Sequence, residues 1–206
     1  RRFELDGTAM PDVELPGLGT LAELGGEADE PQAYLTYTDF TTPATNYRLD
    51  VASGRLELLF APDSGIDPAD YRTEQVFFNS RDGTRVPMYI VSRRDLPTDQ
   101  PHPLVLYGYG GFNVSLLPGY STARMAWLEA GGVYAVANLR GGGEYGEAWH
   151  RAGTRLNKQN VFDDFIAAAE GLIDERRTTP EQLAIWGGSN GGLRVGAVAE
   201  QRPELF

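Results

Sequence analysis

Two patterns of apolar and polar residues follow one another along the chain. Up to about residue 66, short runs rich in Tyr, Leu and Thr alternate with turn residues, which is typical of β-strands. The predicted strands cover 33–40, 46–51 and 55–60. Three or four antiparallel strands make only a small sheet that is marginal in water, so we expect it to belong to a larger β array. The acidic segment 25–31 is predicted to be an exposed loop.

The pattern changes after residues 61–70, a stretch rich in Pro, Asp and Gly that marks the predicted boundary between domains 1–66 and 67–206. The pair Asp82-Gly83 predicts a hairpin turn. The remaining predicted elements are strands at 74–80, 85–92, 103–111, 133–143 and 182–189, and helices at 122–132, 160–175 and 190–201. Alternation of strand and helix is typical of a parallel sheet covered on both faces, so the second domain is predicted to be α/β.

Ser189 lies where a predicted strand meets a predicted helix, inside the pattern Gly187-x-Ser189-x-Gly191. This is the nucleophile-elbow pattern, in which a very tight turn exposes a strained serine. Flanking glycines remove side chains that would collide, and the helix N-terminus directs N–H groups and a positive dipole end towards the hydroxyl. The N–H of Asn190 would then stabilise an oxyanion. The alternative is a glycine-rich turn whose serine only caps a helix.

The segment 107–113 ends an earlier strand with the sequence YGYGGFN. In an elbow fold the loop at this place supplies the second oxyanion donor. The phenol of Tyr109 is a hydrogen-bond donor near neutral pH, and Phe112 would form a wall of a substrate pocket. Taken alone, the same residues are typical of a glycine-rich turn with core aromatics.

A nucleophilic serine needs a base, and the chain contains only His102 and His150. Elbow folds place the acidic residue and then the histidine after the serine, whereas both histidines precede Ser189. We therefore expect neither histidine to act, and expect the missing Asp and His to lie beyond Phe206.

On a third glycine-rich loop, Arg140 and Glu144 are expected to be structural, either paired with each other or ordering the site loops.

Composition narrows the choice of function. The net charge of −11 disfavours nucleic acid as a partner, and no apolar run is long enough to span a bilayer. The chain has no cysteine, which excludes thiol chemistry and disulfides. No metal or cofactor is implied. We expect a cytoplasmic location, with the periplasm as the alternative.

Several ordered motifs resemble the prolyl oligopeptidase family of serine peptidases. They are DYRTEQVFFNSRDGTRVPMYIV, LYGYGGFN, GGVYAVANLRGGGEYGEAWH, NKQNVFDDF and GGSNGGL. The resemblance implies a seven-bladed β-propeller joined to an α/β-hydrolase domain. Residues 1–66 would then be a propeller-blade fragment, and 67–206 the N-terminal part of the peptidase domain.

By this resemblance Ser189 is the nucleophile, Asn190 and Tyr109 form the oxyanion hole, and Phe112 belongs to the proline pocket. The substrate would be a short proline-containing peptide, cleaved on the carboxyl side of proline by a protein that is monomeric at full length. The form GGSNGG favours this specificity over oligopeptidase B relatives, whose elbow typically reads GRSAGG.

Alternatives are a dipeptidyl- or acylaminoacyl-peptidase, an oligopeptidase B-like enzyme, an esterase, or a non-catalytic fragment. Arg194 departs from the family, whose members usually carry an apolar residue there. It would lie at a local surface, find a carboxylate, or impair folding.

Overall fold

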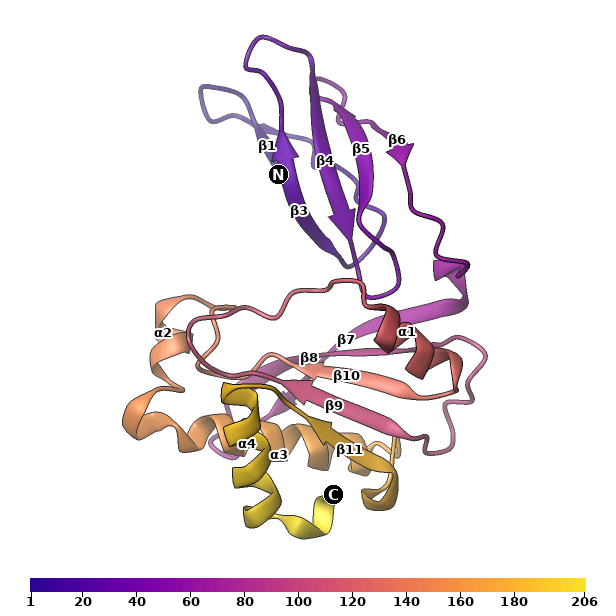
Figure 1. The fold of residues 1–206 in the computed structure, drawn as a ribbon. Helices are drawn as coiled ribbons and strands as arrows, with labels where there is room; N and C mark the ends of the chain where they lie inside the picture. The colour runs from indigo at the N-terminus through magenta and orange to yellow at the C-terminus, as the bar shows by residue number, and fades with distance from the viewer. The chain divides into compact units, whose positions relative to one another are not determined.

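The computed structural model describes residues 1–206, which form two compact units. The first comprises residues 1–68 with 117–122, and the second comprises 69–116 with 123–206. Each has its own sheet and its own buried cluster, so each is described by itself (Figure 1).

The first unit is built on an antiparallel sheet of four strands in the order β3-β4-β5-β6, beside a short two-stranded ladder. The strands are β1 Arg2–Phe3, β2 Ala9–Met10, β3 Thr20–Gly25, β4 Gln32–Thr38, β5 Thr45–Asp50 and β6 Leu56–Phe60. The predicted strands thus correspond to β4, β5 and β6. Strand β3, which the sequence patterns did not predict, pairs with β4 and has a register shift between Leu21 and Glu23.

A small core of Leu35, Tyr37 and Leu49 stabilises this sheet. Tyr37 is fully buried, and its hydroxyl donates a hydrogen bond of 2.9 Å to Asp39. Gly19 packs directly against the Tyr37 ring, because a Cβ there would lie 2.4 Å from it. This contact explains why the chain needs a glycine at that point. Burial, followed by the charge of Asp39, raises the pKa of the Tyr37 phenol.

The second unit contains a five-stranded mixed sheet in the order β11-β9-β10-β8-β7. The strands are β7 Tyr71–Asn79, β8 Arg85–Arg93, β9 Leu104–Gly108, β10 Val133–Ala137 and β11 Leu183–Trp186. Strands β9, β10 and β11 are parallel, as predicted. The sheet is not parallel throughout, because the hairpin β7–β8 joins it antiparallel to β10.

Helices cover both faces of this sheet, with α3 and α4 on one side and α1 on the other (Figure 1). The helices are α1 Thr122–Glu129, α2 Glu147–Arg151, α3 Gln159–Asp174 and α4 Asn190–Gln201, and single 3₁₀ turns occur at Pro68–Asp70, Arg155–Asn157, Pro180–Gln182 and Pro203–Leu205. Phe165 and Leu172 of α3 and Val198 of α4 pack with Ala135 and Ala137 of β10. On the α1 side, the Arg124 guanidinium lies 4.6 Å from the Tyr134 ring centroid.

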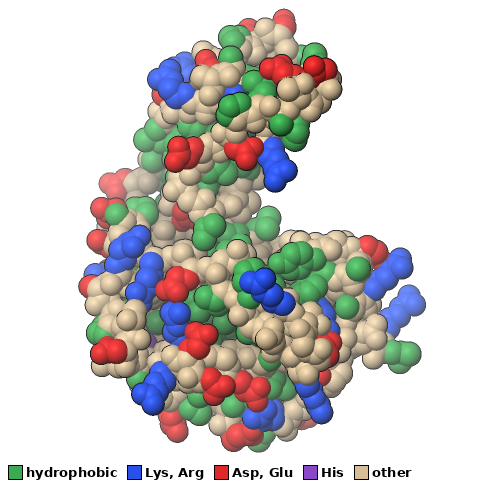
Figure 2. Space-filling view, turned by 180° about the vertical axis from the view of Figure 1, so that it is seen from behind, with side chains coloured by type: hydrophobic (Ala, Val, Ile, Leu, Met, Phe, Trp, Pro, Cys, Tyr) green, Lys and Arg blue, Asp and Glu red, His purple; other side chains and the backbone are tan.

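Charged side chains of both signs are interspersed on the face shown in Figure 2, where neither sign gathers into one broad patch. Several charged side chains of the protein form ion pairs, such as Arg93, which contacts both Asp95 and Glu129. None of the helices has the length and apolar character that a membrane span requires.

Candidate active site

Ser189 occupies a sharp turn between the end of β11 and the start of α4. Its backbone has φ 53° and ψ −122°, a region that residues with a side chain rarely occupy and that costs about 1–3 kcal/mol. The side chain is exposed, and its hydroxyl does not cap the helix. The alternative of a helix-capping serine is therefore wrong for this structure.

The two glycines of the elbow pattern make the turn possible because they lie against each other. A Cβ on Gly187 would lie 2.5 Å from the carbonyl oxygen of Gly191, and a Cβ on Gly191 would lie 3.1 Å from that of Gly108. Asn190 begins α4, so its N–H is one of the amides that a helix leaves without an intrahelical partner. That amide adjoins the Ser189 hydroxyl, where an oxyanion would need a donor.

Tyr109 and Phe112 lie on the loop that follows β9, the strand paired with β11. The pairing of Trp186 with Tyr107 brings the carboxyl ends of both strands to one edge of the sheet. Phe112 adopts φ 54°, which turns the loop and leaves its ring largely exposed, 6.5 Å from the Tyr109 ring. The structure therefore brings all four predicted site residues to the same edge of the sheet.

Three consecutive backbone carbonyls of this loop accept hydrogen bonds from side chains. The pairs are Arg194 Nη2 with Gly108 at 2.9 Å, Asn190 Nδ2 with Tyr109 at 2.9 Å, and Lys158 Nζ with Gly110 at 2.8 Å. Asn190 and Arg194 are four residues apart, so they project from one face of α4. The elbow helix thereby fixes the loop that carries Tyr109. Sequence reasoning missed this use of the Asn190 side chain.

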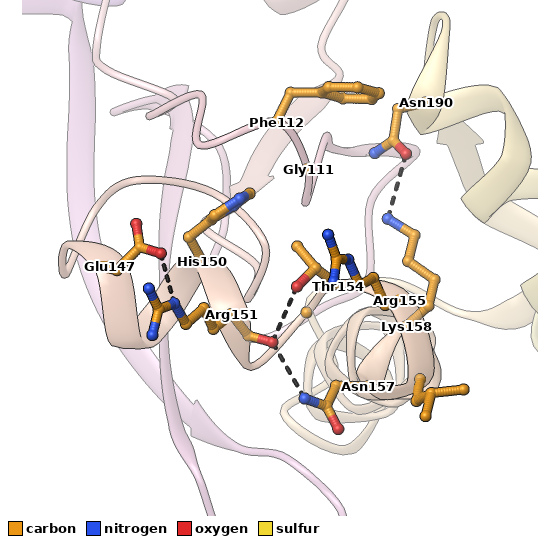
Figure 3. A pocket seen from close by; sticks show the side chains of 12 residues that line it. Gly111, Phe112, Glu147, His150, Arg151, Thr154, Arg155, Asn157, Lys158 and Asn190 are labelled. Carbon is orange, nitrogen blue, oxygen red and sulfur yellow. Dashed lines mark hydrogen bonds and ion pairs between the residues drawn. The ribbon is translucent and has the colours of Figure 1, made fainter.

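Lys158, at the start of α3, is a second site residue that the sequence analysis did not single out. Its ammonium also lies 3.2 Å from Asn190 Oδ1, so it joins helix, loop and elbow (Figure 3). Burial, together with the nearby charge of Arg194, lowers the pKa of this lysine. The only sequence signal was its place in the motif NKQNVFDDF, which does not show what the side chain contacts.

A cavity of about 1080 Å³ opens beside the elbow. Phe112 and Asn190 line one part of it, and residues of α2 and of the turn that leads to Lys158 line the rest (Figure 3). The charged residues in its lining are Glu147, Arg151, Arg155 and Lys158. Because Arg151 pairs with Glu147, the cavity carries an excess of positive charge beside one exposed aromatic ring.

Neither histidine hydrogen bonds to Ser189. His102 Nε2 lies 2.7 Å from the carbonyl oxygen of Pro97. His150 lies within α2 and lines the cavity, but its Nδ1 is 2.8 Å from the Gly141 carbonyl oxygen and 3.1 Å from the Asn113 amide. In this structure both rings are bound to backbone groups away from the serine.

Arg140 and Glu144 do not pair with each other. Each instead binds groups on neighbouring segments of the chain. Buried Arg140 binds Asp164 of α3 at 2.6 Å and Asp82 of the hairpin turn at 2.5 Å. Glu144 accepts hydrogen bonds from the Leu116 amide at 2.9 Å and from a side-chain amide nearby. Both side chains make the structural contacts expected of them, and of the two alternatives the mutual pair is wrong.

A strained serine between a parallel strand and a helix, on a sheet with helices on both faces, defines the α/β-hydrolase class. Family models match in two places: the prolyl oligopeptidase family over residues 118–206, and its N-terminal β-propeller domain over residues 2–62. The chain belongs to the prolyl oligopeptidase family.

Individual relatives agree with this assignment. The chain is 44% identical over 205 residues to a prolyl endopeptidase of Elizabethkingia miricola, covering 100% of this chain and 29% of the relative. A solved structure of a prolyl endopeptidase matches 98% of this chain and 30% of its own with a TM-score of 0.90 and 53% identity. Oligopeptidase B of Leishmania major matches 87% of this chain and 25% of its own, at a TM-score of 0.79 and 39% identity. The chain thus spans under a third of the length of these relatives.

Proposed function

We propose that the protein containing this chain is a serine peptidase that cleaves short peptides on the carboxyl side of proline. Ser189 carries the proposal, because its strained backbone holds an exposed hydroxyl at a strand-to-helix turn. In the reaction the Ser189 oxygen attacks the peptide carbonyl carbon, and a histidine takes the hydroxyl proton. The Asn190 N–H and the Tyr109 hydroxyl donate hydrogen bonds to the negative oxygen that forms.

Preference for proline rests on the cavity beside the elbow. Phe112 offers an exposed aromatic face against which a proline ring can pack. The unpaired cations Arg155 and Lys158 in the lining disfavour a substrate with Arg or Lys before the scissile bond. This charge argues against the cleavage after basic residues that the likeness to oligopeptidase B would suggest.

The test uses the full-length protein, a fluorophosphonate probe and two chromogenic peptides that differ only in proline or arginine before the scissile bond. We expect probe labelling and cleavage of the proline peptide, both abolished by Ser189→Ala. Labelling that survives Ser189→Ala would contradict the role of the serine. Equal kcat/KM for the two peptides would contradict the proline preference alone.

A further inference from the structure

Arg194 is the largest side chain that is completely buried in the structure, and it carries a charge. It neither reaches a local surface nor contacts a carboxylate. Its guanidinium fills space that glycines leave open beneath the elbow. A Cβ on Gly187 would lie 2.5 Å from Nη2, and one on Gly108 would lie 3.4 Å from Nη1. The guanidinium therefore packs directly under the backbone that carries Ser189.

A single nitrogen of this group joins the ends of two strands. Nη2 donates hydrogen bonds of 2.9 Å to the carbonyl of Gly108 and of 2.9 Å to the carbonyl of Trp186. Gly108 ends β9 and Trp186 ends β11, and the last pair in the ladder between these strands is Trp186 with Tyr107. Arg194 thus links the strands where the ladder stops, immediately before Tyr109 and the Ser189 turn.

This arrangement is unfavourable for stability, which indicates that packing alone does not explain it. Nε and Nη1 of Arg194 are buried and have no hydrogen-bond partner. Besides the two carbonyls that Nη2 contacts, the charge is compensated by the Phe165 ring, whose centroid lies 3.5 Å from the guanidinium carbon. Burial lowers the pKa of Arg194 to about 9, so the group is still charged at neutral pH. An apolar side chain would avoid this cost.

We propose that Arg194 is a positioning residue that sets the distance between the Ser189 hydroxyl and the Tyr109 phenol by holding the ends of β9 and β11 together. The inference rests on the proposed function, in which these two groups act on one substrate carbonyl. An error of about 1 Å in such an arrangement can cost about a hundredfold in rate. The loss should therefore fall on kcat, because substrate contacts in the cavity do not involve Arg194.

The experiment compares Arg194→Met, Arg194→Lys and the control Arg81→Met in the full-length protein. Arg81 is exposed and makes no ion pair, so its replacement removes an arginine without touching the site. For Arg194→Met we expect kcat to fall tenfold or more, KM to stay within threefold, and the unfolding temperature not to fall. For Arg194→Lys we expect a smaller loss of kcat, about threefold to tenfold, since an ammonium lacks the planar fork of a guanidinium.

A kcat within twofold of wild type in Arg194→Met would overturn the inference. So would a loss of kcat that follows a lowered unfolding temperature, because that is the result of a merely structural role. If Arg194→Met does not fold, Arg194→Lys becomes the test of the inference, and a wild-type kcat in Arg194→Lys would overturn it. Ser189→Ala is measured alongside: activity that survives it contradicts the proposed function and the inference together. Activity lost in Ser189→Ala but kept in both Arg194 variants contradicts the inference alone.

Discussion

Tyr109 is the residue at which the proposed oxyanion hole differs from one made only of backbone amides. Its ring lies near that of Phe112. The backbone carbonyls of the loop accept hydrogen bonds from Asn190 and Lys158, so the loop that carries the phenol is held in place. A donor that is already in place costs no reorganisation when negative charge develops on the substrate. The hydroxyl can therefore contribute to kcat although it need not contribute to binding.

Replacing Tyr109 with Phe removes the hydroxyl and keeps the ring. We expect kcat to fall about 10²- to 10³-fold with KM nearly unchanged, as for other oxyanion-hole donors. The control is Tyr107→Phe, which removes a hydroxyl two residues earlier and keeps the ring contact with Trp186. Steady-state kinetics of the full-length protein on the proline peptide measure both. Equal effects of the two variants would contradict a specific role for Tyr109.

Sequence reasoning predicted candidate site residues where a local pattern indicates a role, and it missed side chains whose contacts are with residues far away in the chain. Ser189 and Asn190 were predicted because strand, glycines and helix adjoin them in the chain. Lys158 reaches a loop 48 residues away, and no local pattern reports that contact. For Arg194 the sequence left three alternatives, and the structure contradicts two of them, because the buried guanidinium binds strand-end carbonyls and neither reaches a local surface nor contacts a carboxylate.

Among the secondary-structure elements, those with strong periodicity were predicted well. Helix α3 has apolar residues at helical spacing and a buried face, and its predicted and observed bounds agree within one residue at each end. Strand β3 was missed because it is mostly exposed, so burial imposes no clear alternation of apolar and polar residues on it. The ladder between β1 and β2 has only two residues in each strand, too few to show an alternation of apolar and polar residues.

The hairpin β7–β8 is connected to α3 through Arg140, which links the Asp82 turn to buried Asp164. The hydrogen bond from Arg140 lowers the pKa of Asp82 from 3.8 to about 2. Because the folded-state pKa is depressed, the Asp82 carboxylate contributes stability that is present above about pH 4. That contribution is lost as the pH falls towards 2.

We expect Asp82→Asn to lower the free energy of unfolding at pH 7 and to make its decrease between pH 4 and pH 2 shallower. The effect should stay below about 1 kcal/mol, since the Asp82 side chain is 48% exposed and solvent screens the pair. Urea unfolding of the full-length protein at each pH measures the difference. Asp99→Asn, which changes an exposed loop aspartate without an ion pair, is the control. A pH dependence that is the same in both variants would contradict the assignment.

In the molecule as a whole, the match to the propeller domain and the predicted site residues lie in different units. The first unit carries the match to the propeller domain, and the second carries all four predicted site residues. Alternation of strands and helices was enough to predict an α/β second unit. The return of residues 117–122 to the first unit was not predictable, because it rests on hydrogen bonds such as that between Thr20 and the Pro118 carbonyl, 98 residues apart.

The last prediction concerns the 206-residue chain on its own. Its second unit contains the proposed nucleophile and the two proposed oxyanion donors, but its two histidines bind backbone carbonyls rather than Ser189. A serine hydroxyl without an adjacent base is a weak nucleophile at neutral pH, so positioned donors alone should not support turnover. We expect no cleavage of the proline peptide by the isolated chain, under conditions in which circular dichroism shows it folded and the full-length protein is active. Cleavage by the isolated chain that Ser189→Ala abolishes would mean that His150 or another group within these residues acts as the base, and His150→Ala would then identify it.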